Sequence, residues 1–325
     1  MAMLVGCATT RSLPMAPSAL APRAELTDTP FFPQEPEQCG PAALATVLNF
    51  YGRTTTPDIL RTWIYVPKRG GSLQLEIAAT ARRHDMLAYP LEGELETLLR
   101  ELAGGHPVLV LQNLGLSWLP RWHYAVAIGY DLERRVLLLR SGTEHRRETD
   151  FDVFMNTWRR GGAWALVIIP PDRAPAAAEL ETWLNAATDL EATQRYDAAY
   201  RAFTTIATRA PDDARAWLGL ANNALHVGRA DAAAHAYRQS LNIQPGQPIT
   251  WNNFAYALRD MSCGDEASRA VACAVALAPR DARVADSSRE ITAVASAPRA
   301  ATCPALPACP AALGAPAGAL LPTQP

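Results

Sequence analysis

The stretch PQEPEQCGPAALATVLNFYG, residues 33–52, places a cysteine beside Gly-Pro where a polar segment gives way to an apolar pattern of helical period. Proline is favoured in the first turn of a helix, so Pro41 predicts a helix that begins near Cys39 and ends at Gly52. A cysteine needed only for packing would lie within the apolar face, whereas Cys39 stands ahead of it. The position therefore indicates a chemical role for the thiol.

A thiol at a helix N-terminus has its thiolate form favoured by the positive end of the helix dipole. Such a nucleophile also needs a base, and the best placed histidine is His123, which opens a predicted strand after a loop. His106 also precedes a strand, but its context, GGHPV, is typical of a turn. Polar or repeat contexts indicate solvated or packing roles for the other histidines: His84, His145, His226 and His235.

Short runs of apolar and β-branched residues, bounded by turn residues, predict strands at 107–113, 123–131, 135–141 and 164–170. The segment ELETLLRELAGG predicts a helix before the first of these strands. Residues 31–171 are therefore expected to form an α+β domain, with a helix followed by an antiparallel sheet.

A second domain is indicated by a repeat of 34 residues within 180–296. Three positional series keep this step: Trp183, Trp217 and Trp251; Ala199, Ala233 and Ala267; and Pro211, Pro245 and Pro279. An opening Trp, a small residue where helices touch and a terminating Pro resemble the tetratricopeptide repeat. The resemblance implies an all-α solenoid with repeats at about 180–213, 214–247 and 248–281 and a closing helix, and a protein or peptide partner bound to it.

Two asparagines of this region are candidate peptide-binding residues. Asn222 and Asn253 fall where tetratricopeptide repeats often use Asn to hold a ligand backbone. The alternative is that both are ordinary polar helix residues. The lysines of carboxylate-clamp repeats are absent, which disfavours recognition of a terminal carboxylate.

The first half of the chain resembles the papain-like cysteine peptidases that trim double-glycine leaders from bacteriocins, and more closely their stand-alone bacterial lipoprotein relatives. The resemblance rests on QEPEQCGPAALA around Cys39 and HYAVAIGYD around His123, and it covers roughly residues 31–171. It implies that Cys39 is the nucleophile and His123 its base. It also implies that Gln34 donates to the oxyanion beside the backbone N–H of Cys39.

Two positions depart from the family pattern. Gln34 lies five residues before Cys39, one fewer than is common, which leaves Gln38 as an alternative donor. Where the family usually orients the histidine with Asp or Asn, the nearest match is Ser141, and a hydroxyl stabilises an imidazolium less than a carboxylate does. The less favoured candidates for this role are Asp131 and Asp150.

Residues 1–30 are expected to be a lipoprotein signal remnant and tether, because LVGC resembles a lipobox whose cysteine, here Cys7, is lipidated. The alternative is a chance cysteine in a disordered leader, since the charged n-region and most of the apolar h-region are missing. Lipidation would anchor the chain in the bacterial envelope, facing the periplasm, and Ala8 is compatible with the outer membrane. Residues 172–179 are expected to be a linker, and 297–325, rich in Ala and Pro, a disordered tail.

Composition argues against several classes of partner. The 30 basic and 32 acidic residues nearly balance, so nucleic acid is not expected to bind. The chain has no Gly-x-x-x-x-Gly-Lys phosphate loop and no Cys-x-x-Cys spacing, so neither ATP nor a metal is expected, and no cofactor is implied. In an oxidising compartment Cys263 with Cys273, or Cys303 with Cys309, could form disulfides; the favoured alternative for the first pair is helix packing.

The sequence thus predicts a lipid-anchored cysteine peptidase that hydrolyses peptide bonds and recruits a protein or peptide through its repeats. The alternative from another class is a non-catalytic, peptidase-like scaffold, which the missing carboxylate motivates. A transferase that passes the same acyl group to an amine is a third alternative, because it shares the thioester intermediate.

Overall fold

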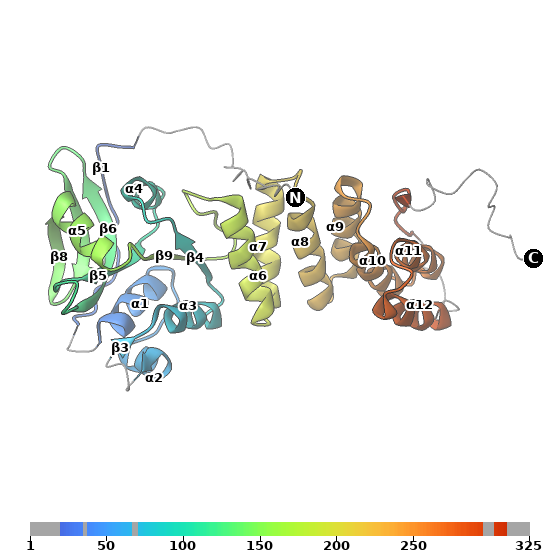
Figure 1. Ribbon diagram of the computed structural model, residues 1–325, viewed down its shortest axis with the longest axis horizontal. Helices are drawn as coiled ribbons and strands as arrows, with labels where there is room; N and C mark the ends of the chain where they lie inside the picture. Colours follow the sequence, from blue (N-terminus) through green and yellow to red (C-terminus); the bar gives the residue numbers. More distant parts are fainter. Residues whose placement is uncertain (1–19, 35–37, 67–70, 295–301, 311–325) are drawn as a thin grey trace, which may run out of the picture. The chain divides into compact units, whose positions relative to one another are not determined.

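The computed structural model describes residues 20–34, 38–66, 71–294 and 302–310. The chain divides into two compact units at Ala198/Ala199, within α7 (Tyr196–Arg209). The first unit is α+β and the second is helical, which confirms the predicted fold class (Figure 1). Among the helices of the described ranges, none combines the length and apolar character that crossing a membrane requires.

The first unit is built on an antiparallel sheet in the order β4–β9–β5–β6–β7–β8, with β1 also paired to β6. The predicted strands 107–113, 123–131, 135–141 and 164–170 correspond to β5, β6, β7 and β9, which are the inner strands of this order. The strands are β1 (Arg23–Glu25), β4 (Leu87–Leu91), β5 (Val108–Asn113), β6 (Trp122–Asp131), β7 (Val136–Ser141), β8 (Glu144–Asp150) and β9 (Ala165–Ile169), with a separate hairpin of β2 (Tyr65–Val66) and β3 (Gly71–Ser72).

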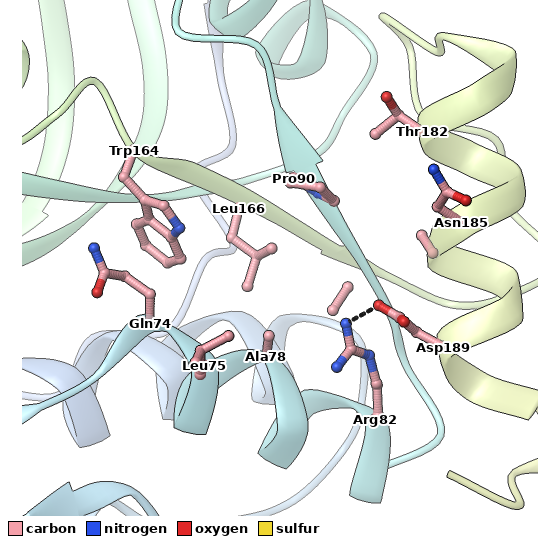
Figure 2. Close-up of a pocket in the computed structure, with 12 residues that line it drawn as sticks. Gln74, Leu75, Ala78, Arg82, Pro90, Trp164, Leu166, Thr182, Asn185 and Asp189 are labelled. Atoms are coloured by element: carbon pink, nitrogen blue, oxygen red, sulfur yellow. Dashed lines mark hydrogen bonds and ion pairs between the residues drawn. The ribbon is translucent and has the colours of Figure 1, made fainter. Parts of the chain in front are cut away.

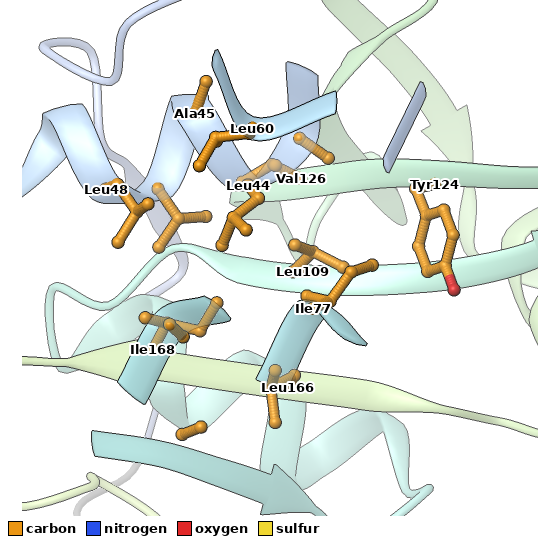
Figure 3. Packing of buried hydrophobic residues seen from close by; sticks show 14 of the residues in the cluster. Leu44, Ala45, Leu48, Leu60, Ile77, Leu109, Tyr124, Val126, Leu166 and Ile168 are labelled. Carbon is orange, nitrogen blue, oxygen red and sulfur yellow. The ribbon is translucent and has the colours of Figure 1, made fainter. Parts of the chain in front are cut away.

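Two helices pack on one face of the sheet, α1 (Cys39–Phe50) and α3 (Gln74–Arg83), and α2 (Pro57–Ile64) packs against both of them. Leu44 and Leu48 of α1 pack in the same buried cluster as Val126 of β6 (Figure 3). Successive strand residues point to opposite faces of a sheet. Leu109 of β5 faces the cluster under α1, so Val108 and Val110 face the other side, and they are also buried. The second face of the sheet is therefore covered too. The helices α4 (Leu95–Ala103) and α5 (Phe151–Arg160) contact β6 and β5 respectively.

The segment 172–179, expected to be a linker, is hydrogen-bonded to the first unit. The backbone N–H of Ala177 donates to Glu101 Oε1 at 2.8 Å, and the N–H of Glu179 donates to Tyr89 Oη at 2.9 Å. The next helix, α6 (Leu180–Ala192), contacts β4, and its Asp189 forms an ion pair with Arg82 of α3. The first helix of the first repeat therefore belongs to the α+β unit.

The second unit begins within α7 and continues with helices that follow the 34-residue period: α8 (Ala214–His226), α9 (Ala230–Ile243), α10 (Pro248–Asp260), α11 (Gly264–Leu277) and α12 (Ala282–Val294). The indole Nε1 of Trp217 donates to the carbonyl of Pro211, and Trp251 donates to Pro245, both at 2.8 Å. This bond ties the start of one repeat to the end of the one before it. It explains why Trp217 and Trp251 each lie six residues after the turn that precedes their helix.

Two disulfides join the segment 302–310 to α11 and its N-cap: Cys263–Cys303 and Cys273–Cys309. The predicted pairings Cys263–Cys273 and Cys303–Cys309, and the helix-packing alternative, were wrong. Cys263 is the N-cap of α11 and Cys273 lies ten residues along it, a helical rise of about 15 Å, well beyond the roughly 7 Å that a disulfide allows. Residues 302–310 thus differ from the expected disordered tail, whose other residues lie outside the described ranges.

Reduction of both disulfides should release residues 302–310 from α11. Because this short segment buries little of its own surface, we expect thermolysin to cleave it about tenfold faster in the reduced protein. Limited proteolysis followed by mass spectrometry would measure the rate, with cleavage of the first unit as the internal control. Equal rates before and after reduction would show that packing, and not the disulfides, holds the segment.

Candidate active site

Cys39 is the first residue of α1, as the Gly-Pro step predicts, and its side chain is partly exposed and not in a disulfide. Backbone N–H groups near the sulfur, those of Cys39 and Gly40 in the helix and that of Tyr124 in β6, act to lower the pKa of the thiol. Tyr124 directly follows His123. The fold therefore brings the thiol to the start of the strand that carries the candidate base.

Burial raises the pKa of the Cys39 thiol above its ordinary value, and the three N–H groups only partly offset this effect. The helix N-terminus acts in the predicted direction, but desolvation outweighs it. The thiol is therefore protonated at neutral pH in the unliganded protein, and it must lose its proton when it attacks.

His123 lies at the start of β6, and its Nε2 is 2.8 Å from Ser141 Oγ at the end of β7. Burial, followed by the positive charges of Arg147 and Arg121, lowers the pKa of His123 to about 4. The ring is therefore neutral at neutral pH and able to accept a proton. Its Nδ1 makes no hydrogen bond to another described residue, Cys39 included.

Gln34 is fixed by three hydrogen bonds beside the same strand ends. Its N–H donates to the carbonyl of Gly142 and its Oε1 accepts from the N–H of Gly142, each at 3.0 Å. Its Nε2 donates one hydrogen to the carbonyl of Tyr124 at 3.1 Å, which leaves a second N–H for a substrate oxygen. The alternative donor, Gln38, is the N-cap residue of α1 and its side chain makes no capping bond.

The other candidates have local roles. His106 is buried, and its Nδ1 pairs with Glu101 Oε2 at 2.7 Å. Asp131 accepts from the N–H of Arg134 in a turn, and Asp150 caps α5. Asp131 lies eight residues along β6 from His123, which is about 26 Å in an extended strand. Asp150 pairs with Val136 at that same distant end, so neither carboxylate reaches the ring.

Tyr124 and Ser72 were not singled out by the sequence, yet they line the wall beside the thiol. Tyr124 Oη donates to the carbonyl of Ser72 at 3.2 Å, and its ring meets Trp164 edge-on with centroids 5.8 Å apart. The two residues come from separate elements, β6 and β3, and no local pattern relates them. Their proximity to Cys39 arises only from the packing of α1 on the sheet.

Gly40→Ala should destabilise the protein, although alanine is the better helix former. An added methyl group would lie 2.5 Å from Ser72 Oγ and 2.6 Å from Ser72 Cβ. Such overpacking costs about 1 to 3 kcal/mol, which urea unfolding would detect. Ser72→Gly in the same protein should restore most of the loss. A loss that this second change leaves intact would contradict the steric explanation.

The candidate residues of the repeats lie together. Asn253 Nδ2 donates to Asn222 Oδ1 at 3.2 Å, and Tyr237 Oη donates to the same oxygen at 2.9 Å. Both asparagines are half-buried. The lipidation candidate, Cys7, lies outside the described residues.

Within the described part of the chain, one group of potential metal ligands has its atoms within 4.8 Å of one another: Cys263, Glu266 and Cys303. Both sulfurs are already joined in a disulfide, so they are not thiolate ligands in this state.

Comparison with known proteins agrees with both resemblances. Residues 26–165 match the Peptidase_C39 like family, and residues 190–254 match a tetratricopeptide repeat family, which confirms the two predicted resemblances. No curated protein matches this sequence.

Three solved structures illustrate the similarity. A C39-like peptidase from Bacillus anthracis is 18% identical, with coverage of 45% of this chain and 97% of that one and a TM-score of 0.41. The Yersinia enterocolitica type III secretion chaperone SycD, in complex with a peptide of the translocator YopD, is 21% identical over 36% and 88% of the two chains, with a TM-score of 0.33. The tetratricopeptide domain of Arabidopsis OM64 is 12% identical over 34% and 93%, with a TM-score of 0.33.

Proposed function

Since residues 26–165 are a domain of the C39-like peptidase family and tetratricopeptide repeats follow, we propose that the protein is a cysteine peptidase whose repeats recruit a protein or peptide. One observation carries the proposal. The backbone N–H of Tyr124 lowers the pKa of the Cys39 thiol, and the residue before Tyr124 in β6 is His123, whose neutral ring lies 2.8 Å from Ser141 Oγ through Nε2.

In the proposed reaction, His123 Nδ1 removes the proton of the thiol as sulfur attacks the carbonyl carbon of the peptide bond. The oxyanion accepts from the backbone N–H of Cys39 and the second N–H of Gln34. The imidazolium then gives its proton to the leaving amine, and the C–N bond breaks. Water, deprotonated by His123, attacks the thioester, and the released thiolate recovers the proton.

Ser141 is a positioning residue in this scheme. Its hydroxyl lies 2.8 Å from Nε2. In the scheme it accepts from Nε2–H, which leaves Nδ1 unprotonated. It adds no negative charge, and the low pKa of His123 and the raised pKa of Cys39 both favour a neutral pair. Proton transfer therefore accompanies sulfur attack, in place of a preformed thiolate–imidazolium pair.

The proposed location is the bacterial cell envelope, with a lipid on Cys7 and the chain facing the periplasm, anchored in the outer membrane. The lipobox-like LVGC motivates the anchor. The two disulfides support an oxidising compartment, because such bonds are rare where thiols are kept reduced. Globomycin treatment of expressing cells, followed by mass spectrometry of the N-terminus, would test lipidation; an unmodified Cys7 with or without the drug would exclude it.

A non-catalytic binding module is the second candidate. The raised pKa of Cys39 and the lowered pKa of His123 favour it, because both keep the pair uncharged. A scaffold needs no reactive thiol, whereas a peptidase needs Cys39 to react through His123. Alkylation of Cys39 by iodoacetamide in wild type and in His123→Ala separates the two. Equal rates at every pH would support the scaffold, and a slower variant would support the peptidase.

The direct test is cleavage of a peptide library of defined composition by the full chain, with products identified by mass spectrometry. Wild type should yield recurring cleavage sites that Cys39→Ala does not produce. New N-termini mark hydrolysis, while ligated products would mark acyl transfer to an amine. Identical product patterns from the two proteins would defeat the proposed activity.

A further inference from the structure

The turn between β5 and β6, residues 114–122 (LGLSWLPRW), gathers large apolar side chains that the fold leaves exposed. Trp118 is 79% exposed and Leu119 is 60% exposed. Three further members of the group are exposed by 41% to 57%: Leu114, Leu116 and Trp122. Single apolar residues are normal on a protein surface, but a contiguous exposed group marks an interaction site. We call residues 114–122 the apolar hairpin.

Hydrogen bonds hold the apolar hairpin in one shape. The buried Asn113 accepts at Oδ1 from the N–H groups of Gly115 and Arg121, both at 2.9 Å. Leu116 and Leu119 exchange backbone hydrogen bonds, each at 3.1 Å. Backbone groups without partners resist transfer into an apolar medium. A hairpin that pairs them internally can therefore leave water at lower cost.

The tip of the hairpin offers apolar surface on all its sides. Every residue of 116–122 is exposed, so no residue of the tip is buried against the described part of the chain. A protein partner with a flat surface would cover one side and leave the other side chains in water. A membrane interface deforms around an inserted loop, and tryptophan is enriched at that depth. The exposure therefore favours a lipid surface over a second protein.

The base of the hairpin is basic. Residues 102–130 contain no Asp or Glu, whereas Arg121 lies in the hairpin itself. Arg160 Nη2 donates to the carbonyl of Asn113 at 3.2 Å. This bond places the end of α5, with the exposed Arg159, beside the hairpin base.

An acidic side chain at the same end of the sheet leaves this charge in place. Glu144 begins β8 there, but it pairs with Arg147 at 3.3 Å, so the two add no net charge. The tip is therefore apolar and its base positive. A membrane that contains anionic lipid is complementary to both, because its interior takes up apolar side chains and its surface attracts arginine.

From these observations we infer that the apolar hairpin docks the protein on a membrane that contains anionic lipid. Trp118 and Leu119 enter the boundary between headgroups and acyl chains, and Arg121 and Arg159 contact the headgroups. The hairpin lies on the membrane and does not span it. Since β6 begins with the last residue of the hairpin, docking brings the candidate base to the membrane surface. The inference depends neither on the proposed lipid anchor nor on peptidase activity.

Vesicle flotation of the full chain carrying Cys7→Ser, which cannot be lipidated, tests the inference. The probe is a vesicle of phosphatidylcholine with about 30% phosphatidylglycerol, beside one of phosphatidylcholine alone. The protein should float with the anionic vesicles and bind the neutral ones about tenfold more weakly. Trp118→Ser with Leu119→Ser should lower partition onto the anionic vesicles by about tenfold or more. Ile59→Ser on α2, 51% exposed and outside the hairpin, should leave it unchanged.

Two further variants separate the tip of the hairpin from its base. Arg121→Gln with Arg159→Gln should weaken binding to the anionic vesicles by about tenfold and leave binding to the neutral ones unchanged. Trp118→Phe keeps an aromatic side chain and should still bind. Brominated phosphatidylcholine should quench less tryptophan fluorescence in this variant than in its parent, because the indole at the tip is missing.

Failure of the Cys7→Ser protein to float with anionic vesicles would overturn the inference. Flotation that survives Trp118→Ser with Leu119→Ser, or quenching that survives Trp118→Phe, would also overturn it. Urea unfolding of each variant is the control for folding. Two other occupants are tested without lipid. Self-association in sedimentation velocity, or cleavage of library peptides, that only the tip variant loses would assign the hairpin to a second copy or to the substrate if vesicles are not bound, and would overturn membrane docking.

Discussion

Ser141→Asp is expected to accelerate alkylation of Cys39 at pH 7 by about tenfold to hundredfold, because a nearby carboxylate shifts an ionisable partner by about one to three pKa units. Ser141 Oγ already lies 2.8 Å from His123 Nε2, so the carboxylate of an aspartate here comes within hydrogen-bond reach of the ring once the longer side chain turns to make room. In wild type, no carboxylate contributes to the pKa of His123, while burial and two arginines lower it to about 4. The added charge would stabilise the imidazolium and, through it, the thiolate.

The pH profile of iodoacetamide alkylation measures the effect. In wild type the midpoint should lie above the ordinary thiol pKa, because burial raises the pKa of Cys39. Ser141→Asp should move this midpoint to lower pH. Ser141→Asn is the matched control, since it has nearly the same shape without the charge, and it should behave as wild type. If Asp and Asn gave the same midpoint, the charge would not act through His123.

The pKa of His123 should determine the pH below which peptide cleavage is lost. A base whose pKa is lowered to about 4 stays neutral, and competent, until the pH falls through about 4. Wild-type cleavage should therefore persist in mildly acidic buffer and fall only near that value. In Ser141→Asp the raised pKa of His123 should move the acid limb to higher pH. An acid limb near pH 6.5 in wild type would contradict the burial of the ring.

The sequence predicted the inner strands and missed the two edge strands for a physical reason. β5, β6, β7 and β9 are buried, so they carry apolar runs that stand out against their turns. The edge strand β8, EHRRETD, is almost entirely exposed and has no apolar alternation. The other edge, β4, contains Pro90, which weakens a strand prediction but is tolerated where no hydrogen bond is required.

Residues of the candidate site were visible because their signals are local: a thiol before Gly-Pro, and a histidine at a strand start. The pKa shifts of Cys39 and His123 could not be predicted in this way, because the burial that causes them depends on how α1 packs against β6. The sequence suggested a helix-activated thiolate, whereas tertiary packing favours a neutral pair. A groove between α3, the β4–β9 pair and α6 was equally invisible, since its lining runs from Gln74 to Asp189 (Figure 2).

Arg140→Ala is expected to lower the free energy of unfolding by about 3 to 5 kcal/mol, because it removes a buried, fully bonded cation side chain. Arg140 is only 3% exposed. Its guanidinium donates to the carbonyl oxygens of Thr27, Thr29 and His145. Without the side chain these acceptors lose their donor, and each unpaired buried acceptor costs about 1 to 3 kcal/mol.

The hydrogen bonds of Arg140 to Thr27 and Thr29 also hold the segment 27–34 in place. Their loss should therefore displace Gln34 in the candidate site. Urea unfolding measures the stability, and peptide cleavage measures the position of Gln34. Arg134→Ala is the control, because Arg134 is exposed and pairs only at the surface with Glu148 and should leave both readouts unchanged. A loss of stability below about 1 kcal/mol in Arg140→Ala would contradict this expectation, because three carbonyls would then have lost their buried donor at little cost. It would mean that the pairing of β1 with β6 alone holds the segment 27–34 in place.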